Sequence, residues 1–222
     1  MFLPALAFAG LAGCLDFRPS ATDMTEWPGS LLPALIQNQS STTDSGTGSG
    51  GATVVYMYTD SVPVGGGQGN RAATNAICST MQTTNFAALS CTKHMAVLSY
   101  SGGDDLVNAP ANEGLPSGVP VRSATENLVA ADWGTFLTGP DNSLQTAGVS
   151  TGAPVPYYWT SSLAGGGYDG THNCADNTNS TMPVTGAQAA VITTAGTHIA
   201  FANNQPCDGS MNQAFLVCVC WN

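Results

Sequence analysis

Two cysteines near the C-terminus are the residues with the clearest chemical potential. Cys218 and Cys220 lie one residue apart in the apolar run AFLVCVCWN. Because such a run is typical of a buried β-strand, both thiols are predicted on the same face of that strand. The pair could serve as metal ligands, as a redox pair, as a catalytic thiol with a neighbour, or as the ends of two disulfides.

The surrounding sequence argues against a metal site or a catalytic cysteine. Structural zinc sites usually combine closely spaced cysteine pairs with further Cys or His residues, whereas His94, His172 and His198 are scattered along the chain. A catalytic cysteine needs a His partner and a reactive environment, and the apolar LVCVC run indicates burial. We therefore expect no metal ion and no catalytic residue here.

Two clusters of polar residues give weaker signals. Asp104 and Asp105 are adjacent in a Gly-rich loop, where neighbouring side chains usually diverge. Asp169, His172 and Asp176 fall within YDGTHNCADNTN and could form a weak calcium or proton-transfer site. A solvated polar loop is the favoured interpretation of this second cluster.

The remaining motifs and the charge exclude several classes of function. The GGGQG run at Gly65–Gly69 is reminiscent of a phosphate cradle, but no Lys follows it. No nucleophile elbow, P-loop or HExxH motif occurs. The chain has 14 Asp and Glu against 4 Lys and Arg, a net charge of −10, and its cations do not cluster. We therefore expect no enzyme, no cofactor, and no nucleic-acid or heparin-like partner.

The N-terminal segment MFLPALAFAGLAGC indicates export. Its apolar run is too short to span a bilayer and ends in small residues, as a signal peptide does. Leu11–Cys14, LAGC, resembles the bacterial lipobox; a buried helix that ends in Cys is the alternative. The lipobox implies a signal peptide over residues 1–13 and lipidation of Cys14. The simplest inner-membrane retention signal is an Asp directly after the lipidated Cys, and this chain has Leu15 at that position. Its absence favours an outer-membrane or cell-surface lipoprotein.

Residues 14–52 are predicted to form a flexible tether, and residues 53–222 one globular domain. The tether contains SSTTDSGTGSGG, which offers almost no side chain to bury. Hydrophobic residues make up 43% of the chain, enough for a core. Charged residues make up only 8%, against roughly 25% in ordinary soluble domains. Such an uncharged polar surface is common in secreted and cell-surface proteins.

Within the domain, apolar patterns predict an α+β order of elements. The predicted strands are residues 53–59, 94–100, 157–163 and 214–222, with a hairpin or two short strands in 189–202. The first and last strands are expected in one sheet. Polar loops are predicted at 101–120 and at 164–182.

Two helices are predicted. The first covers residues 70–84, with Ala72, Ala76, Ile77 and Met81 on its buried face and Cys78 on or next to that face. The second covers residues 123–139, where Ser123 and Glu126 have the spacing of a capping box.

The order of these segments resembles the endostatin-like branch of the C-type lectin-like fold. It looks especially like bacterial lipoproteins that share this branch and are described only as domains of unknown function. The resemblance covers roughly residues 53–222 and implies two helices with a mixed, mostly antiparallel sheet. It rests on the helix with Cys78, then AVLSY, VPV, DWGTFLTG, YYWTSS, NC at Cys174, PC at Cys207, and FLVC at Cys218.

The resemblance implies disulfides between Cys78 and Cys218 and between Cys174 and Cys207. It also implies that Trp133 and Trp159 belong to the core, which agrees with the usual role of aromatic residues in such segments.

A third disulfide is predicted from the remaining cysteines. With Cys14 assigned to the lipid, Cys91 and Cys220 are left over, and an oxidising compartment favours their pairing. Cys218 and Cys220 face the same layer, and Cys91 lies just beyond the helix that carries Cys78. We therefore predict Cys91–Cys220, with the swapped pairing of 78 with 220 and 91 with 218 as the main alternative.

The expected function is that of a lipid-anchored, non-catalytic binding or adhesion module. Its partner would be an unknown glycan or protein that contacts the loops 101–120 and 164–182. Calcium-dependent sugar binding of the lectin type is not expected, because Cys207 stands where that site needs a carboxylate and no Trp-Asn-Asp motif occurs. The alternatives are a structural or self-assembling envelope or appendage protein, and a secreted enzyme with an unrecognised site.

Overall fold

The structure is a computed structural model that describes residues 52–150, 156–210 and 214–222. These residues belong to one compact unit, residues 49–222. The predicted signal peptide, the lipidation of Cys14 and nearly all of the predicted tether lie outside the described residues. Among the helices that are described, none has the length and apolarity needed to cross a membrane.

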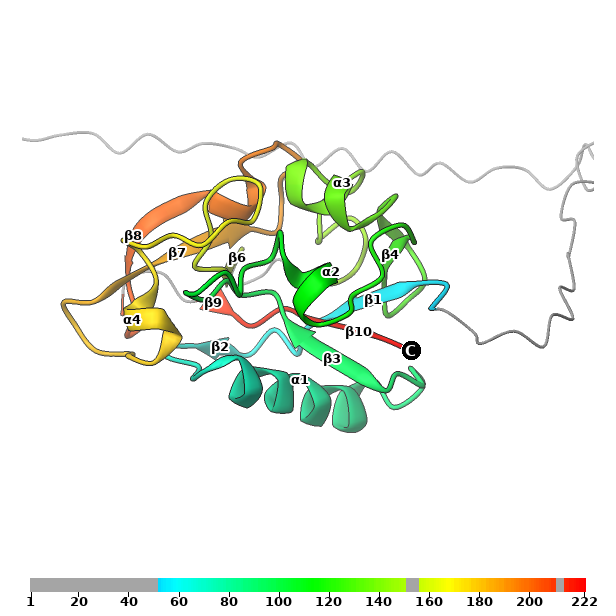
Figure 1. The fold of residues 1–222 in the computed structure, drawn as a ribbon, viewed down its shortest axis with the longest axis horizontal. Coiled ribbons are helices and arrows are strands. Elements are labelled where there is room, and N and C mark those ends of the chain that lie inside the picture. Colours follow the sequence, from blue (N-terminus) through cyan, green and yellow to red (C-terminus); the bar gives the residue numbers. More distant parts are fainter. Residues whose placement is uncertain (1–51, 151–155, 211–213) are drawn as a thin grey trace, which may run out of the picture. The chain divides into compact units, whose positions relative to one another are not determined.

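The domain is α+β, as predicted, and contains two five-stranded sheets (Figure 1). In the first sheet, the initial strand pairs antiparallel with the final one, so that Met57 lies opposite Val219. The prediction that these two strands share a sheet is confirmed. The strands of this sheet, in spatial order, are β3 (Lys93–Ala96), β10 (Cys218–Trp221), β1 (Val55–Tyr58), β4 (Val121–Ser123) and β5 (Leu128–Ala130).

The second sheet corrects the expectation of a single sheet. The final apolar run divides, because Ala214–Phe215 pair in one sheet and Cys218–Trp221 in the other. Pairing is antiparallel in both sheets except between β1 and β4 and between β6 and β9. The strands, in spatial order, are β2 (Pro63–Val64), β9 (Ala214–Phe215), β6 (Tyr157–Trp159), β7 (Thr185–Ala190) and β8 (Ala202–Pro206).

Four α-helices lie in the described residues, where two were predicted. They are α1 (Arg71–Asn85), α2 (Ala109–Asn112), α3 (Trp133–Thr138) and α4 (Cys174–Asn177), and a 3-10 turn covers His198–Ala200. Asn70, the residue before α1, caps the helix, because its side chain accepts a hydrogen bond of 3.0 Å from the Ala73 N–H. Such a cap satisfies one of the backbone donors that a helix start leaves unpaired.

The buried face of α1 differs from the predicted one. Thr74, Cys78, Met81 and Gln82 are buried, whereas Ala72, Ala76 and Ile77 are exposed. The helix packs against β3 (Figure 1), and specific partners such as the disulfide at Cys78 decide which side faces inward. Apolar spacing alone therefore indicated the wrong face, apart from Met81 and Cys78.

The predicted capping box at Ser123 and Glu126 does not form. Ser123 ends β4, and its N–H donates to the Asn127 carbonyl oxygen at 2.9 Å, which closes a turn. The Glu126 carboxylate instead accepts a hydrogen bond of 2.7 Å from the Tyr56 hydroxyl. Helix α3 is capped by the preceding residue, Asp132, whose carboxylate accepts a hydrogen bond of 2.7 Å from the Thr135 N–H.

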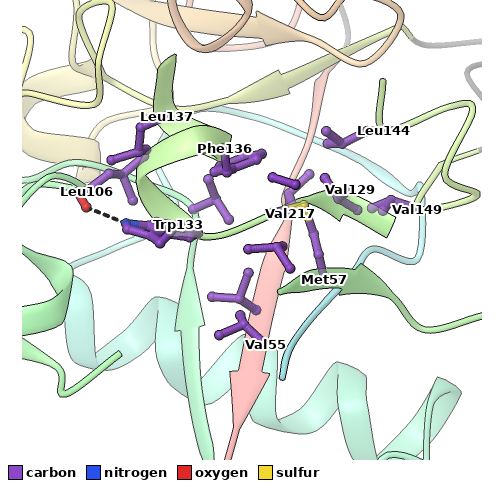
Figure 2. Close-up of a cluster of buried hydrophobic side chains, with 14 of the residues drawn as sticks. Val55, Met57, Leu106, Val129, Trp133, Phe136, Leu137, Leu144, Val149 and Val217 are labelled. Carbon is purple, nitrogen blue, oxygen red and sulfur yellow. Dashed lines mark hydrogen bonds between the residues drawn. The ribbon is translucent and has the colours of Figure 1, made fainter. Parts of the chain in front are cut away.

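The two tryptophans are core residues, as predicted. Trp133 is 1% exposed and packs with Phe136 in the main hydrophobic cluster (Figure 2). Its indole N–H donates to the Leu106 carbonyl oxygen at 2.8 Å. Trp159 is fully buried in a second cluster and donates to the Val64 carbonyl oxygen at 2.8 Å. Both buried indoles therefore have the partner that burial requires.

Candidate functional site

The two long polar loops, residues 101–120 and 164–182, lie side by side and form what we call the paired-loop surface. Ser101 donates from its N–H and its hydroxyl to the two carboxylate oxygens of Asp176, at 2.9 and 2.7 Å. The Asn177 side chain donates to the Ser99 carbonyl oxygen at 2.9 Å. Segments far apart in the sequence are thus fastened to each other.

The buried hydroxyl groups of Ser99 and Ser162 link the two loops beneath the protein surface. The Ser99 hydroxyl donates to the Gly166 carbonyl oxygen at 2.9 Å and accepts from the Leu106 N–H at 3.2 Å. Ser162 donates to Ser99 at 2.8 Å. Because a buried polar group is costly unless it is hydrogen-bonded, these contacts hold the loop backbones in one arrangement.

The prediction of a solvated polar loop for YDGTHNCADNTN, residues 168–179, is wrong for Asp169 and Asn177. Asn177 is fully buried and Asp169 is 4% exposed. Both side chains bond to backbone groups of their own loop or of the neighbouring segment. The polar composition of this loop therefore serves internal hydrogen bonding as much as solvation, which composition alone does not reveal.

The short element α4 differs from the other helices because its backbone is left-handed. Cys174, Ala175, Asp176 and Asn177 have φ values of 54°, 53°, 57° and 60°. Left-handed backbone costs roughly 1–2 kcal/mol per non-glycine residue, and it persists where the surroundings over-determine it, often at ligand sites. Here the Cys174–Cys207 disulfide and the contacts of Asp176 with Ser101 hold the turn in place.

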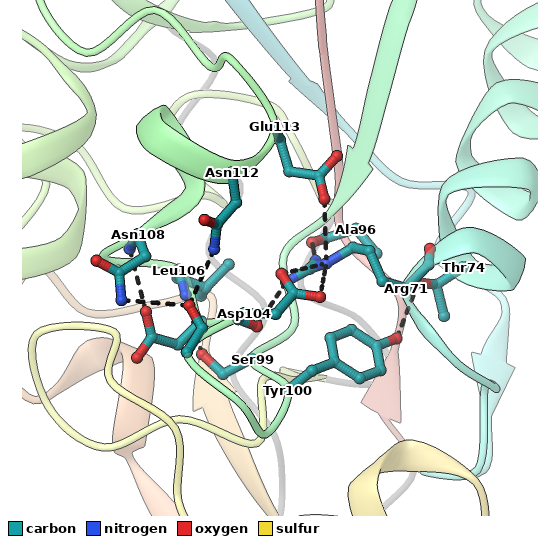
Figure 3. A network of polar contacts seen from close by, with 12 residues as sticks. Arg71, Thr74, Ala96, Ser99, Tyr100, Asp104, Leu106, Asn108, Asn112 and Glu113 are labelled. Carbon is teal, nitrogen blue, oxygen red and sulfur yellow. Dashed lines mark hydrogen bonds and ion pairs between the residues drawn. The ribbon is translucent and has the colours of Figure 1, made fainter.

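Arg71 anchors the loop 101–120 to α1 (Figure 3). Its side chain is 11% exposed, and its guanidinium lies 3.0 Å from the Asp104 carboxylate and donates to the carbonyl oxygens of Ala96 and Asp104 at 3.0 and 3.1 Å. It also lies 4.5 Å from the centre of the Tyr100 ring. Burial raises the pKa of Tyr100 to about 12, so the phenol stays neutral and shares a hydrogen bond of 2.9 Å with Thr74.

Asp104 and Asp105 point to different partners, as expected. Asp104 contacts Arg71, whereas Asp105 accepts a hydrogen bond of 3.1 Å from the Asn108 N–H at the start of α2. The two carboxylates therefore do not form a pair for acid–base chemistry.

Asp169 and His172 are brought together. The imidazole Nδ1 lies 3.1 Å from an Asp169 carboxylate oxygen. Burial raises the pKa of Asp169, but hydrogen bonds from the backbone N–H groups of His172 and Thr171 and from the His172 ring outweigh it, so the net pKa lies below its usual value. Within the part of the chain that the structure covers, no hydroxyl or thiol bonds to His172, so the pair lacks a nucleophile.

The calcium interpretation of this segment gains no support. The Asp176 carboxylate bonds to Ser101 rather than joining the pair formed by Asp169 and His172. Residues 52–150, 156–210 and 214–222 contain no group of three or more His, Cys, Asp or Glu side chains placed to hold a metal ion.

Three disulfides join Cys78 to Cys218, Cys91 to Cys220, and Cys174 to Cys207, with Cα separations of 5.5, 5.7 and 5.6 Å. These are the three pairs that were expected, and the swapped alternative does not occur. Disulfides of this number are typical of an oxidising, extracytoplasmic environment.

The glycine run is a packing element that sequence reasoning did not assign. A Cβ atom on Gly66 would lie 2.1 Å from the Cys174 sulfur, and one on Gly67 would lie 2.5 Å from the Ser180 nitrogen. Only glycine leaves room for the disulfide and the neighbouring loop at this distance. The run of glycines in the sequence could have indicated this close packing. Packing against the disulfide, rather than phosphate binding, explains why glycines occupy these positions.

A concave feature lies beside α1. It is a groove of about 430 Å³, lined by Asp60, Ala73, Ala76, Ile77, Thr80, Met81, Thr84 and Asn85. Half of these residues are apolar and half are polar, with Asp60 as the one charged residue among them, a mixture that many ligand sites share. We favour the paired-loop surface as the candidate site because hydrogen bonds through the buried Ser99 hold its two loops in one arrangement.

Comparison of the chain with protein-family models found no match, and comparison with curated proteins found none either.

Proposed function

We propose that the chain is a non-catalytic binding or adhesion module, displayed by a lipid-anchored tether at the outer membrane or cell surface. Its ligand, a glycan or a protein, docks on the paired-loop surface. The observation that carries this proposal is the fastening of two long loops by hydrogen bonds, of which those through Ser99 are buried and the one between Ser101 and Asp176 is exposed. Loops held in one arrangement lose little conformational entropy on binding, which favours recognition.

The fold is proposed to be C-type lectin-like, of the endostatin-like branch. Three observations support this assignment: the α+β order of elements, the pairing of the first strand with the last, and the three disulfides. Function cannot be transferred from a fold, because it depends on site residues, so the ligand class has to be found by experiment.

The binding experiment uses the full chain on a glycan array and in pull-downs with envelope proteins. Ala175→Arg and Val107→Arg place a charge on exposed positions of the paired-loop surface. Thr80→Arg places the same side chain on the outward side of α1 and serves as the matched control. We expect the two loop variants to lose at least about tenfold in affinity, a typical effect of disturbing an interface, and the control to bind normally.

Two results would contradict the proposal. One is a ligand whose affinity changes only in the Thr80→Arg control, which would place the site on α1. The other is turnover of a glycan or peptide substrate by the purified chain, which would make the protein an enzyme.

Self-assembly in an envelope or appendage is the second candidate. Strand β8 lies at the edge of the second sheet, with Asn203 and Asn204 exposed, and an open edge can pair with another copy. Electron microscopy of native envelopes and sedimentation of the purified chain test this candidate, which requires ordered assemblies or concentration-dependent oligomers.

A further inference from the structure

We propose that the Cys91–Cys220 disulfide is a thiol-exchange site, at which an external thiol forms a mixed disulfide with Cys91 while the rest of the fold stays closed. This inference goes beyond ligand binding and does not depend on it. Of the two cysteines near the C-terminus, only Cys220 belongs to a disulfide that solvent can reach, because its partner Cys91 is partly exposed.

The first observation is the unequal exposure of the cysteines. Cys91 is partly exposed, whereas the other five cysteines of the described residues are fully buried. Cys91 also lines a cavity of about 210 Å³, together with Ala52, Thr53, Val54, Tyr56, Trp221 and Asn222. Accessible disulfides are the ones that exchange with external thiols, so Cys91 is the sulfur that such a thiol can meet.

The second observation concerns the direction of attack. Thiol exchange proceeds through attack of a thiolate on one sulfur and departure of the other. Cys220 lies on the inner strand β10, between β3 and β1, and is fully buried. A thiol that enters the cavity therefore approaches Cys91 from outside and displaces Cys220 inward.

The third observation is a histidine next to the leaving sulfur. His94 lies directly opposite Cys220 in the antiparallel pairing of β3 and β10. Side chains opposite each other in this way project from the same face, with Cβ atoms roughly 4.5–5.5 Å apart. His94 is therefore within reach of the thiolate that exchange would create.

His94 has an unused nitrogen for this purpose. Its Nε2 is buried and has no hydrogen-bond partner among the described residues. Burial lowers the pKa of His94, so the imidazole is neutral at pH 7 and can carry a proton on Nε2. A fixed donor beside a developing anion stabilises it, and here the anion is the Cys220 thiolate.

The step balances without an oxidant. The external thiol loses its proton and its sulfur bonds to Cys91, while the Cys91–Cys220 bond breaks and its electron pair stays on Cys220. Cys220 then takes up the proton that the attacking thiol released. One disulfide replaces another, and attack by Cys220 on Cys91 reverses the step.

The fold tolerates this opening because a second bridge lies two residues away. Cys218 on β10 remains bonded to Cys78 on α1, and β10 remains paired with both β1 and β3. Exchange at Cys91 would therefore leave the final strand in place, and would give the domain a reversible covalent attachment point at this end of the first sheet.

The test uses the full chain with reduced glutathione as the probe thiol, followed by alkylation and non-reducing peptide mass spectrometry over time. We expect a glutathione adduct on Cys91 with free Cys220, formed at least tenfold faster than opening of either other disulfide, with an unchanged circular dichroism spectrum. The proposal is refuted by an adduct on Cys220, by opening of all three disulfides at similar rates, or by adducts that form only as the domain unfolds.

His94 is tested as a positioning residue in the Cys91→Ser background, where Cys220 is a free thiol. Thiolate absorbance at 240 nm measures the pH at which Cys220 ionises. We expect His94→Leu to raise the pH at which Cys220 ionises, and His94→Gln, which keeps a hydrogen-bond donor, to return that pH to its original value. In the parent chain, His94→Leu should slow thiol exchange about tenfold, the effect of losing one hydrogen bond to a charged group. Equal ionisation in all three proteins would show that His94 has no such role.

Discussion

His198 should make the stability of the domain depend on mild acid. The residue is fully buried on the 3-10 turn at His198–Ala200, and its ring meets Phe136 edge to face at 5.3 Å between centroids. Neither ring nitrogen has a hydrogen-bond partner among the described residues. Burial therefore lowers the pKa of His198 to about 4, and the imidazole is neutral in the folded state at pH 7.

The sign and size of the effect follow from proton linkage. The unfolded chain binds a proton at this residue below its ordinary pKa of about 6.5, whereas the folded chain does so only near 4. Stability is therefore retained above pH 6.5 and falls as the pH drops from about 6.5 to about 4. The loss should be about 2 kcal/mol at pH 5 and about 3 kcal/mol below pH 4.

The assay compares guanidinium unfolding of the parent chain and of His198→Phe at pH 7.5 and pH 5, followed by tryptophan fluorescence. The variant keeps a flat ring but cannot bind a proton. We expect the free energy of unfolding to fall by about 2 kcal/mol less in the variant than in the parent chain between these two pH values. Phe136→Leu is the control, because it alters packing beside His198 without changing any ionisable group.

One outcome would overturn the reasoning. If His198→Phe and the parent chain lose the same free energy between pH 7.5 and pH 5, the buried imidazole is not the group that responds to acid. Phe136→Leu should lower stability by the same amount at both pH values.

Three further perturbations test the elements around the paired-loop surface. Gly66→Ala should lower the free energy of unfolding by several kcal/mol or prevent closure of the disulfide at Cys174. Gly118→Ala should leave stability unchanged, because a Cβ atom at Gly118 would have no heavy atom within 4 Å. Thermal unfolding and a count of free thiols distinguish the two variants. Arg71→Met should lower the free energy of unfolding by about 1.5–3 kcal/mol, because it removes the hydrogen bonds that the guanidinium donates to Asp104 and Ala96, and it should expose loop 101–120 to limited proteolysis. Asp132→Ala should cost about 1 kcal/mol through loss of the α3 cap, measured by chemical denaturation.

Local patterns predicted several elements correctly. Alternation along a strand places Cys218 and Cys220 on one face, and both sulfurs meet the layer that contains α1 and Cys91. β-Branched and aromatic residues predicted the first and last strands. These inferences succeeded because backbone geometry and residue spacing act over a few residues and do not depend on distant partners.

The paired-loop surface could not be predicted in the same way. Composition marked the loop around Asn177 as polar, but whether such a side chain meets water or a carbonyl oxygen is decided by the segment that packs against it. Here that segment is the one around Ser99, 78 residues away in the sequence. Nothing in the local sequence identifies this partner.

By itself, the sequence determined the α+β class, the strand at each end of the domain, the core positions of Trp133 and Trp159, and which cysteines were available for pairing. Only the tertiary structure decided which face of α1 is buried, where the final apolar run changes from one sheet to the other, and how the polar loops are joined. The physical reason is that periodicity describes a segment's own backbone, whereas burial and hydrogen-bond partners depend on segments that folding brings together.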